Sequence, residues 1–204
     1  MRDALAAAAG RDVSHETFER ICSYAELLKA EASSQNLIAR STLDSLWERH
    51  ILDSAQLVRS EPFAGASWVD IGSGAGLPGI VIAALVEGPV TLIEPRRLRA
   101  EFLQRTVDEL GLAARVTVAA AKVERITGTF DVITGRAVAA LDRFLDLSHH
   151  LSTQNSIWAL PKGRSAKSEL ADAQQRWQGV FHVERSVTDD DSYIVIGTGV
   201  REKL

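Results

Sequence analysis

The sequence predicts an α/β protein with a Rossmann-like, mostly parallel sheet, and three observations support this. From Ser67 onward, short apolar runs alternate with helical stretches, which is the pattern of a parallel sheet covered by helices. The first apolar run leads into a glycine-rich loop and then a helix. The last two runs, residues 180–184 and 193–197, flank three aspartates and leave no room for a helix. Those two strands must therefore pair antiparallel.

Two amphipathic helices are expected before the first strand. Ser14 can cap the first of them, and its apolar side chains recur at helical spacing. After a loop, Ser41 or Thr42 opens the second helix. Because both apolar faces must be buried, we expect residues 1–60 to form a helical extension packed on the core. Residues 61–204 are expected to form that core as a single structural unit.

The elements that follow alternate regularly along the chain. Strands are expected at residues 67–71, 90–94, 115–119, 130–134 and 156–160. Helices are expected at residues 80–85, 96–110, 141–151 and 166–177. The antiparallel hairpin then completes the sheet.

The loop after the first strand carries the strongest local signal. Residues 67–80 read SWVDIGSGAGLPGI, and four glycines fall within eight residues: Gly72, Gly74, Gly76 and Gly79. Glycine has no Cβ, so the backbone can turn tightly and approach a ligand, while Pro78 suits a helix start. Residues 74–79 also match the dinucleotide-binding pattern G-x-G-x-x-G. However, the first glycine follows Asp70 by two positions, which is the D-x-G-x-G-x-G form of enzymes that bind S-adenosylmethionine. A purely structural turn needs fewer glycines.

Size and composition are those of a globular protein. The 204 residues, 22.2 kDa, suffice for one well-buried domain with an appendage. No apolar run approaches the ~20 residues of a membrane span, and the N-terminal alanine run lacks a signal-peptide core. One cysteine, Cys22, leaves no disulfide and no thiolate metal site. The net charge of −4 disfavours broad nucleic-acid binding but allows a local basic patch. We expect a cytoplasmic monomer without metal.

Three residues are candidates for holding the nucleoside part of a cofactor. Glu94 ends the second strand about 20 residues after the glycine loop, the spacing at which a carboxylate reaches ribose hydroxyls. The alternative is a solvated acid before a turn. Val123 and Glu124 follow the third strand, where backbone groups would contact an adenine edge. A plain loop is equally compatible with that stretch.

Cations follow the next two strands. Arg136 lies just beyond the fourth strand and Lys162 just beyond the fifth, and together they favour an anionic substrate such as a phosphate backbone. Three further arginines either extend this patch or form a solvated face: Arg96, Arg97 and Arg99. Arg49 and His50 lie on the second helix, where a histidine among apolar residues is more often a packing residue than a catalytic one.

Together these stretches resemble the bacterial small-subunit ribosomal RNA methyltransferases RsmG, also called glucose-inhibited division protein B. The matching stretches are residues 36–37 (NL), 47–54 (WERHILDS), 70–79 (DIGSGAGLPG), 92–95 (LIEP), 102–103 (FL), 131–137 (DVITGRA) and 162–163 (KG). They keep the family order and span most of the chain. The combination of RHILDS with GxGLPG is specific to that family.

The resemblance implies a class I S-adenosylmethionine-dependent methyltransferase sheet. It implies methyl transfer to N7 of guanine 527 of 16S rRNA, in the 530 loop of the small ribosomal subunit. Family cofactor contacts fall on Gly72, Leu77, Val123, Glu124 and Arg136. Guanine N7 already carries a free lone pair, so no general base is required, and catalysis is mostly alignment.

On this chemistry we expect the two cations beyond the strands to act by positioning. Lys162 is expected to hold phosphate, and Arg136 to shape the junction between cofactor and substrate. A bidentate grip on the guanine O6/N7 edge is not expected, because it would cover the atom being methylated.

Three other functions remain open from the sequence. A nicotinamide-nucleotide oxidoreductase would repeat a second nucleotide-binding half, whereas this chain ends in a hairpin. A noncatalytic rRNA-binding or assembly module would not need the full glycine loop and Glu94. A methyltransferase acting on another RNA site shares every feature described above.

Overall fold

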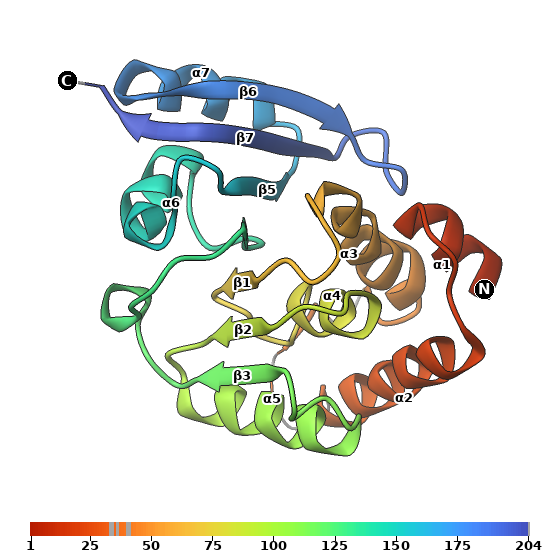
Figure 1. The fold of residues 1–204 in the computed structure, drawn as a ribbon. Coiled ribbons are helices and arrows are strands. Elements are labelled where there is room, and N and C mark those ends of the chain that lie inside the picture. The colour runs from red at the N-terminus through yellow and green to blue at the C-terminus, as the bar shows by residue number, and fades with distance from the viewer. Residues whose placement is uncertain (33–34, 36, 40–41, 204) are drawn as a thin grey trace.

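The computed structural model describes residues 1–32, 35, 37–39 and 42–203. Within these residues a seven-stranded sheet runs in the order β3-β2-β1-β4-β5-β7-β6 (Figure 1). The strands are β1 (Trp68–Ile71), β2 (Val90–Ile93), β3 (Val116–Ala119), β4 (Val132–Thr134), β5 (Ile157–Lys162), β6 (Trp177–Arg185) and β7 (Tyr193–Glu202). β7 alone runs against its neighbours β5 and β6, and all other described pairs are parallel. The predicted fold class and terminal hairpin are confirmed.

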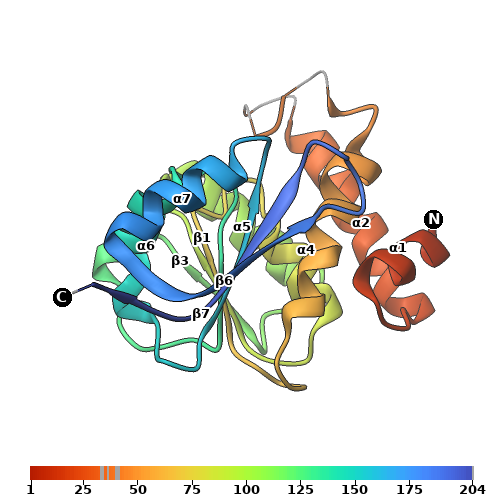
Figure 2. The same ribbon diagram turned by 90° about the horizontal axis from the view of Figure 1, so that it is seen from above.

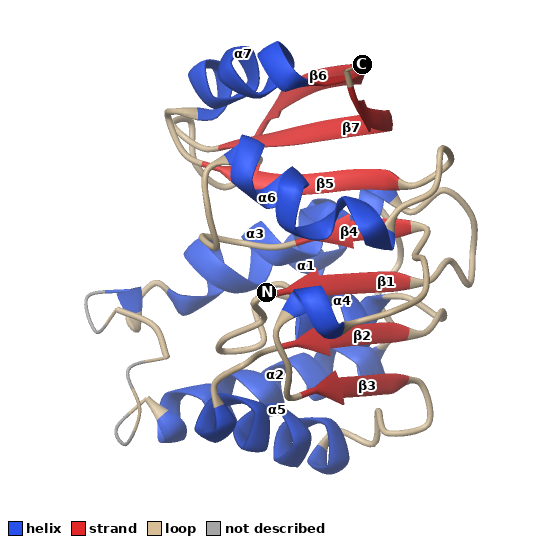
Figure 3. Ribbon diagram, turned by 90° about the vertical axis from the view of Figure 1, so that its left-hand side faces the viewer, coloured by secondary structure: helices blue, strands red, loops and turns tan. Residues whose placement is uncertain are grey.

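Helices cover both faces of this sheet (Figure 3). The α-helices are α1 (Arg2–Ala9), α2 (His15–Glu31), α3 (Asp53–Ala55), α4 (Gly79–Leu85), α5 (Arg97–Glu109), α6 (Leu141–Ser148) and α7 (Ala166–Arg176). The first five contribute to one apolar cluster with the sheet, and α6 and α7 to a second. Alternate residues of β1 enter the two clusters: Trp68 packs in the first, and Val69 and Ile71 in the second.

The N-terminal helices are part of the first cluster. Ser14 caps α2 as predicted, since its Oγ accepts a hydrogen bond of 3.0 Å from the Thr17 amide. The sequence prediction did not include α1, whose Leu5 is fully buried. α1 and α2 lie at the side of the molecule opposite the C-terminus (Figure 2).

The second expected helix differs from a regular α-helix. Trp47–Leu52 is a π-helical segment, Asp53–Ala55 is one α-helical turn, and Gln56–Ser60 is a 3₁₀ turn. π-Helical segments frequently mark functional sites. Of the two predicted start residues, Thr42 precedes the helix, and Ser41 lies outside the described residues, as does Asn36 of the family stretch.

The parallel strands bring the predicted residues to one edge of the sheet. β1 is buried along its whole length and pairs with β2 on one side and β4 on the other. The strand order reverses at β1 and β4, and ligands of such sheets bind beyond the carboxyl ends of the strands at this point. The glycine loop, Glu94, Arg136 and Lys162 all lie at or beyond those ends. Among the described helices, none is long and apolar enough to cross a membrane.

Candidate active site

The glycine loop between β1 and α4 requires glycine for two reasons. Gly72, Gly74 and Gly76 have φ angles of 70°, 55° and 93°, in the left-handed region that favours glycine. A Cβ added at Gly76 would lie 2.6 Å from Ile80 Cγ1, and one at Gly79 would lie 2.3 Å from Leu92 Cδ2. At Gly76 and Gly79 the loop therefore has no room for a side chain, and there its backbone forms a surface that a ligand can approach.

Two buried side chains hold this loop. The Tyr24 hydroxyl, from α2, donates a 2.8 Å hydrogen bond to the Ala75 carbonyl. Asp70 Oδ2 accepts a 3.0 Å bond from the Gly79 amide, at the start of α4. Burial raises the pKa of Asp70 to about 7, although the Gly79 bond and the charge of Arg136 act in the opposite direction. Nothing in the sequence pattern points to Tyr24, because its position on α2 reads as part of the apolar face.

Glu94 lies at the loop, as its spacing predicts. Its side chain is buried, with Oε2 accepting from the Gly74 amide at 3.0 Å and Oε1 accepting from the Arg96 amide at 2.8 Å. The carboxylate thus joins the end of β2 to the glycine loop. Arg96, Arg97 and Arg99 line a separate cavity at the start of α5, and Arg97 pairs with Glu101 at 3.6 Å.

A small, mostly apolar cavity lies beside the loop. It has a volume of about 220 Å³, and its walls include Ile71, Gly72, Ile93, Val123 and Glu124. Apolar walls with a few backbone groups suit the flat ring of a nucleoside. The glycine loop, where a Cβ has no space at Gly76 or Gly79, and this adjoining cavity together fit S-adenosylmethionine. The structure therefore brings Val123 and Glu124 to the same cavity as Gly72, where the sequence left a plain loop equally open.

A larger cavity of about 480 Å³ adjoins the first. Its walls include Arg136, Lys162 and two carboxylates, Asp53 and Glu169. Val138 lines both cavities, and a Cβ added at Gly72 would lie 2.8 Å from its Cγ2. The two predicted cations are thus brought together, next to the end of the glycine loop.

Each of these cations already has an acidic partner. Lys162 Nζ donates to the Ala139 carbonyl at 2.8 Å and pairs with Glu169 Oε2 at 2.9 Å. Arg136 Nη1 lies 3.6 Å from Asp53 Oδ2. The carboxylates partly offset the positive charge that the sequence alone suggested for this site.

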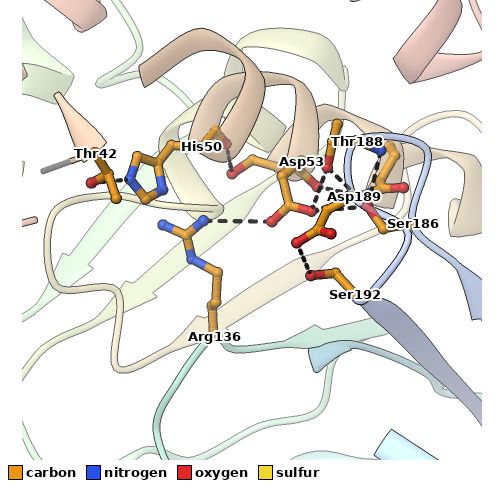
Figure 4. A network of polar contacts seen from close by, with 10 residues as sticks. Thr42, His50, Asp53, Arg136, Ser186, Thr188, Asp189 and Ser192 are labelled. Carbon is orange, nitrogen blue, oxygen red and sulfur yellow. Dashed lines mark hydrogen bonds and ion pairs between the residues drawn. The ribbon is translucent and has the colours of Figure 1, made fainter. Parts of the chain in front are cut away.

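Asp53 also lines the larger cavity, although it was not among the candidates from the sequence. It follows the π-helical segment and lies at the centre of the polar network in Figure 4. Its Oδ1 accepts hydrogen bonds from Gln56 Nε2 at 2.9 Å, Thr188 Oγ1 at 3.2 Å and Ser186 Oγ at 3.3 Å. Its place in the RHILDS stretch is the one signal that could have identified it.

His50 lies near this network but makes a different contact. Its Nε2 is 2.9 Å from Thr42 Oγ1, as Figure 4 shows. Burial lowers the pKa of His50 to about 4, and the charges of Arg136 and Arg49 act in the same direction. The imidazole is therefore neutral at pH 7, and its Nδ1 is buried without a hydrogen-bond partner among the described residues. In the described part of the chain, no group of three or more histidine, cysteine or acidic side chains could hold a metal ion.

Comparisons with known proteins agree with this geometry. A sequence model of the family described as rRNA small subunit methyltransferase G matches residues 17–191. The "Ribosomal RNA small subunit methyltransferase G" of Zymomonas mobilis is 44% identical over 94% of this chain and 90% of that relative. The protein of the same description from Sphingopyxis alaskensis is 48% identical over 91% and 80%.

Solved structures show a similar fold at low sequence identity. A crystal structure of a SAM-dependent methyltransferase from Aquifex aeolicus gives a TM-score of 0.61 at 17% identity. The match covers 76% of this chain and 93% of that one. The likeness shows that the sheet and its covering helices form the same fold in both proteins.

Proposed function

This chain belongs to the family of rRNA small subunit methyltransferase G, and we propose on that basis that it methylates N7 of guanine 527 in 16S rRNA. S-Adenosylmethionine is the methyl donor. The observation that carries the proposal is the adjacency of the two cavities: the one beside the glycine loop suits a nucleoside, and the one next to it is lined by Arg136 and Lys162.

The proposed cofactor site draws on four strand ends. The residues assigned to it are Gly72, Gly74, Gly76, Leu77, Glu94, Val123, Glu124 and Arg136. When bound, S-adenosylmethionine supplies an electrophilic methyl carbon on a sulfonium sulfur. The role of Glu94 is to accept hydrogen bonds from ribose hydroxyls, and the role of the loop backbone is to lie against the methionine part.

The proposed catalytic contribution of the chain is alignment. Guanine N7 carries a lone pair, so the chain needs no side chain to remove a proton. The methylated base is cationic, and Arg136 and Lys162 alone would repel it. Asp53 and Glu169 lie within ion-pair distance of those cations, which reduces the repulsion in the cavity.

Transfer of a labelled methyl group tests the proposal. Small ribosomal subunits and naked 16S rRNA from a strain lacking this enzyme are incubated with the protein and tritiated S-adenosylmethionine. We expect label at one 7-methylguanine, mapped by chemical cleavage to position 527. Label at another position would indicate a methyltransferase for a different RNA site. Binding of rRNA without transfer to either substrate would indicate the noncatalytic assembly module.

A further inference from the structure

We propose that Asp53 is a positioning residue for Arg136. Asp53 orients the Arg136 guanidinium over the larger cavity and couples it to the loop between β6 and β7. The inference rests on the proposed function, since it assigns a role within that reaction. Asp53 and Arg136 both line the larger cavity, although they come from the helical extension and from the end of β4.

The two oxygens of the Asp53 carboxylate have different surroundings. Oδ1 accepts hydrogen bonds from three uncharged side chains, at distances of 2.9, 3.2 and 3.3 Å. Oδ2 faces Arg136 Nη1 at 3.6 Å. The three uncharged donors fix the plane of the carboxylate, and its remaining oxygen then presents negative charge to the guanidinium.

Gln56 secures the same loop one helical turn further along. Its Oε1 accepts from the Val187 amide at 2.9 Å, and its Nε2 donates to Ser186 Oγ at 2.9 Å. Val187 is 54% exposed, so apolar burial contributes little to holding the loop at this point. The polar contacts of Asp53 and Gln56 therefore attach the loop to the helical extension, and Asp53 alone extends that attachment to Arg136.

Orientation of Arg136 requires such a partner. A free arginine side chain carries about 2 kcal/mol of rotamer entropy, so an unpartnered guanidinium in an open cavity samples many positions. The other charged or titratable groups whose charge interacts with Arg136 include His50, which is neutral at pH 7, and Asp70, whose charge is reduced by its raised pKa. Asp53 is the carboxylate within ion-pair distance among the described residues.

Asp53→Asn tests this role because the amide oxygen can still accept hydrogen bonds while the charge is lost. We expect kcat for rRNA methylation to fall about tenfold or more, with KM for the RNA changed less than about threefold. Asp146→Asn is the matched control: Asp146 likewise forms arginine ion pairs, with Arg143 and Arg176, but lies on α6 outside both cavities. The control is expected to stay within about twofold of wild type.

A double-mutant cycle distinguishes positioning from a general structural effect. If Asp53 acts through Arg136, then Asp53→Asn in an Arg136→Lys background lowers kcat by less than about twofold further. A merely structural role predicts effects that multiply, together with a lower melting temperature in both backgrounds. Multiplying effects would overturn the proposal, as would a kcat of Asp53→Asn equal to that of Asp146→Asn.

A spectroscopic readout is independent of methyl transfer. The Arg136 side-chain Nε–Hε signal, assigned by its loss in Arg136→Lys, reports the orientation of the guanidinium. We expect Asp53→Asn to shift and narrow this signal, and Asp146→Asn to leave it in place. If wild type does not methylate 16S rRNA, the proposed function fails while this signal still decides the role of Asp53. An unchanged signal in Asp53→Asn would overturn the inference.

Discussion

Asp70 illustrates how one buried carboxylate serves the site at a cost in stability. It accepts the Gly79 amide that begins α4, while its other oxygen, Oδ1, is buried without a hydrogen-bond partner among the described residues. Its pKa is raised from 3.8 to about 7 because burial disfavours the charged form. Between these values the folded protein binds a proton that the unfolded chain has released.

This difference predicts a pH dependence that Asp70→Asn removes. Stability falls as pH rises wherever the folded state binds more protons, so the Asp70 contribution declines between about pH 4 and pH 7, by about 1.4 kcal/mol per pH unit. The lowered pKa of His50, about 4, makes stability rise with pH below pH 6.5. The Asp70 contribution is therefore the difference in stability between wild type and Asp70→Asn at each pH. Urea unfolding of both proteins from pH 4 to 8 measures the difference, and a difference that stays constant would contradict the prediction.

The proposed role of Lys162 predicts an effect of its substitution on rRNA binding rather than on stability. If Lys162 holds a phosphate, Lys162→Ala weakens rRNA binding. It also makes the plot of log association constant against log salt concentration less steep, by about one. Its ion pair with Glu169 at 2.9 Å is compatible with this, since a lysine ammonium has three donors. Filter binding at several salt concentrations measures the slope.

The matched control for that measurement is Lys29→Ala. Lys29 pairs with Glu26 on the surface of α2 and is expected to leave the slope unchanged. Loss of methylation in Lys162→Ala at unaltered RNA affinity would exclude the phosphate role.

At the scale of elements, the loop between β1 and α4 depends on the helix beneath it. Tyr24→Phe removes the hydroxyl that donates to the Ala75 carbonyl, leaving a buried acceptor unpaired at a cost of about 1–3 kcal/mol. We expect weaker binding of S-adenosylhomocysteine by calorimetry as well as lower stability. Ser148→Ala removes a comparable buried hydroxyl, bonded to the Phe144 carbonyl, far along the chain from the loop. If both variants bind the product equally, Tyr24 has no particular role in shaping the loop.

The packing around Gly76 predicts that an added methyl group disrupts the loop, and Gly128 provides a control with a similar backbone angle. Gly76 and Gly128 have similar φ angles, 93° and 98°, but a Cβ at Gly76 would meet Ile80 Cγ1 at 2.6 Å whereas Gly128 has open space. Both alanine variants bear the backbone strain, and only Gly76→Ala adds overpacking of about 1–3 kcal/mol. We expect Gly76→Ala to lose affinity for S-adenosylhomocysteine by about tenfold or more, and Gly128→Ala to retain it. Equal affinities would show that the loop tolerates a methyl group.

At the scale of the whole molecule, we propose that residues 1–60 are a helical extension and residues 61–204 a single structural unit, and that both unfold together. Support comes from the first apolar cluster, in which Leu5 and Leu28 pack with Trp68 of β1. We expect tryptophan fluorescence and far-ultraviolet circular dichroism to give the same urea midpoint.

Leu28→Ala should lower both midpoints together, at a cost of about 2–5 kcal/mol, because Leu28 is fully buried. Leu98→Ala, at a position 57% exposed, should leave both within about 0.5 kcal/mol. Separate transitions for the two probes would show that the extension folds independently.

Much of the fold was predictable because its signals are local. The strand, glycine loop and helix around Gly72 follow from the backbone needs of one segment, and the hairpin follows from the short link at Asp189–Asp191. α1 was missed because no capping side chain marks its start: Met1 at the N-cap makes no side-chain hydrogen bond to the helix. The π-helical segment was missed because its spacing of apolar residues also fits an α-helix over so few turns.

The sequence by itself determined the fold class, the cofactor loop and the family, since each depends on residue types at fixed local spacing. Tertiary structure alone decided which side chains support that loop and orient Arg136. Tyr24 lies 51 residues from Ala75, and Asp53 lies 133 residues from Ser186. Such contacts depend on how helices pack across the sheet edge, which no spacing within a segment encodes. The polar network around Asp53 therefore forms only where the helical extension, the end of β4 and the hairpin come together.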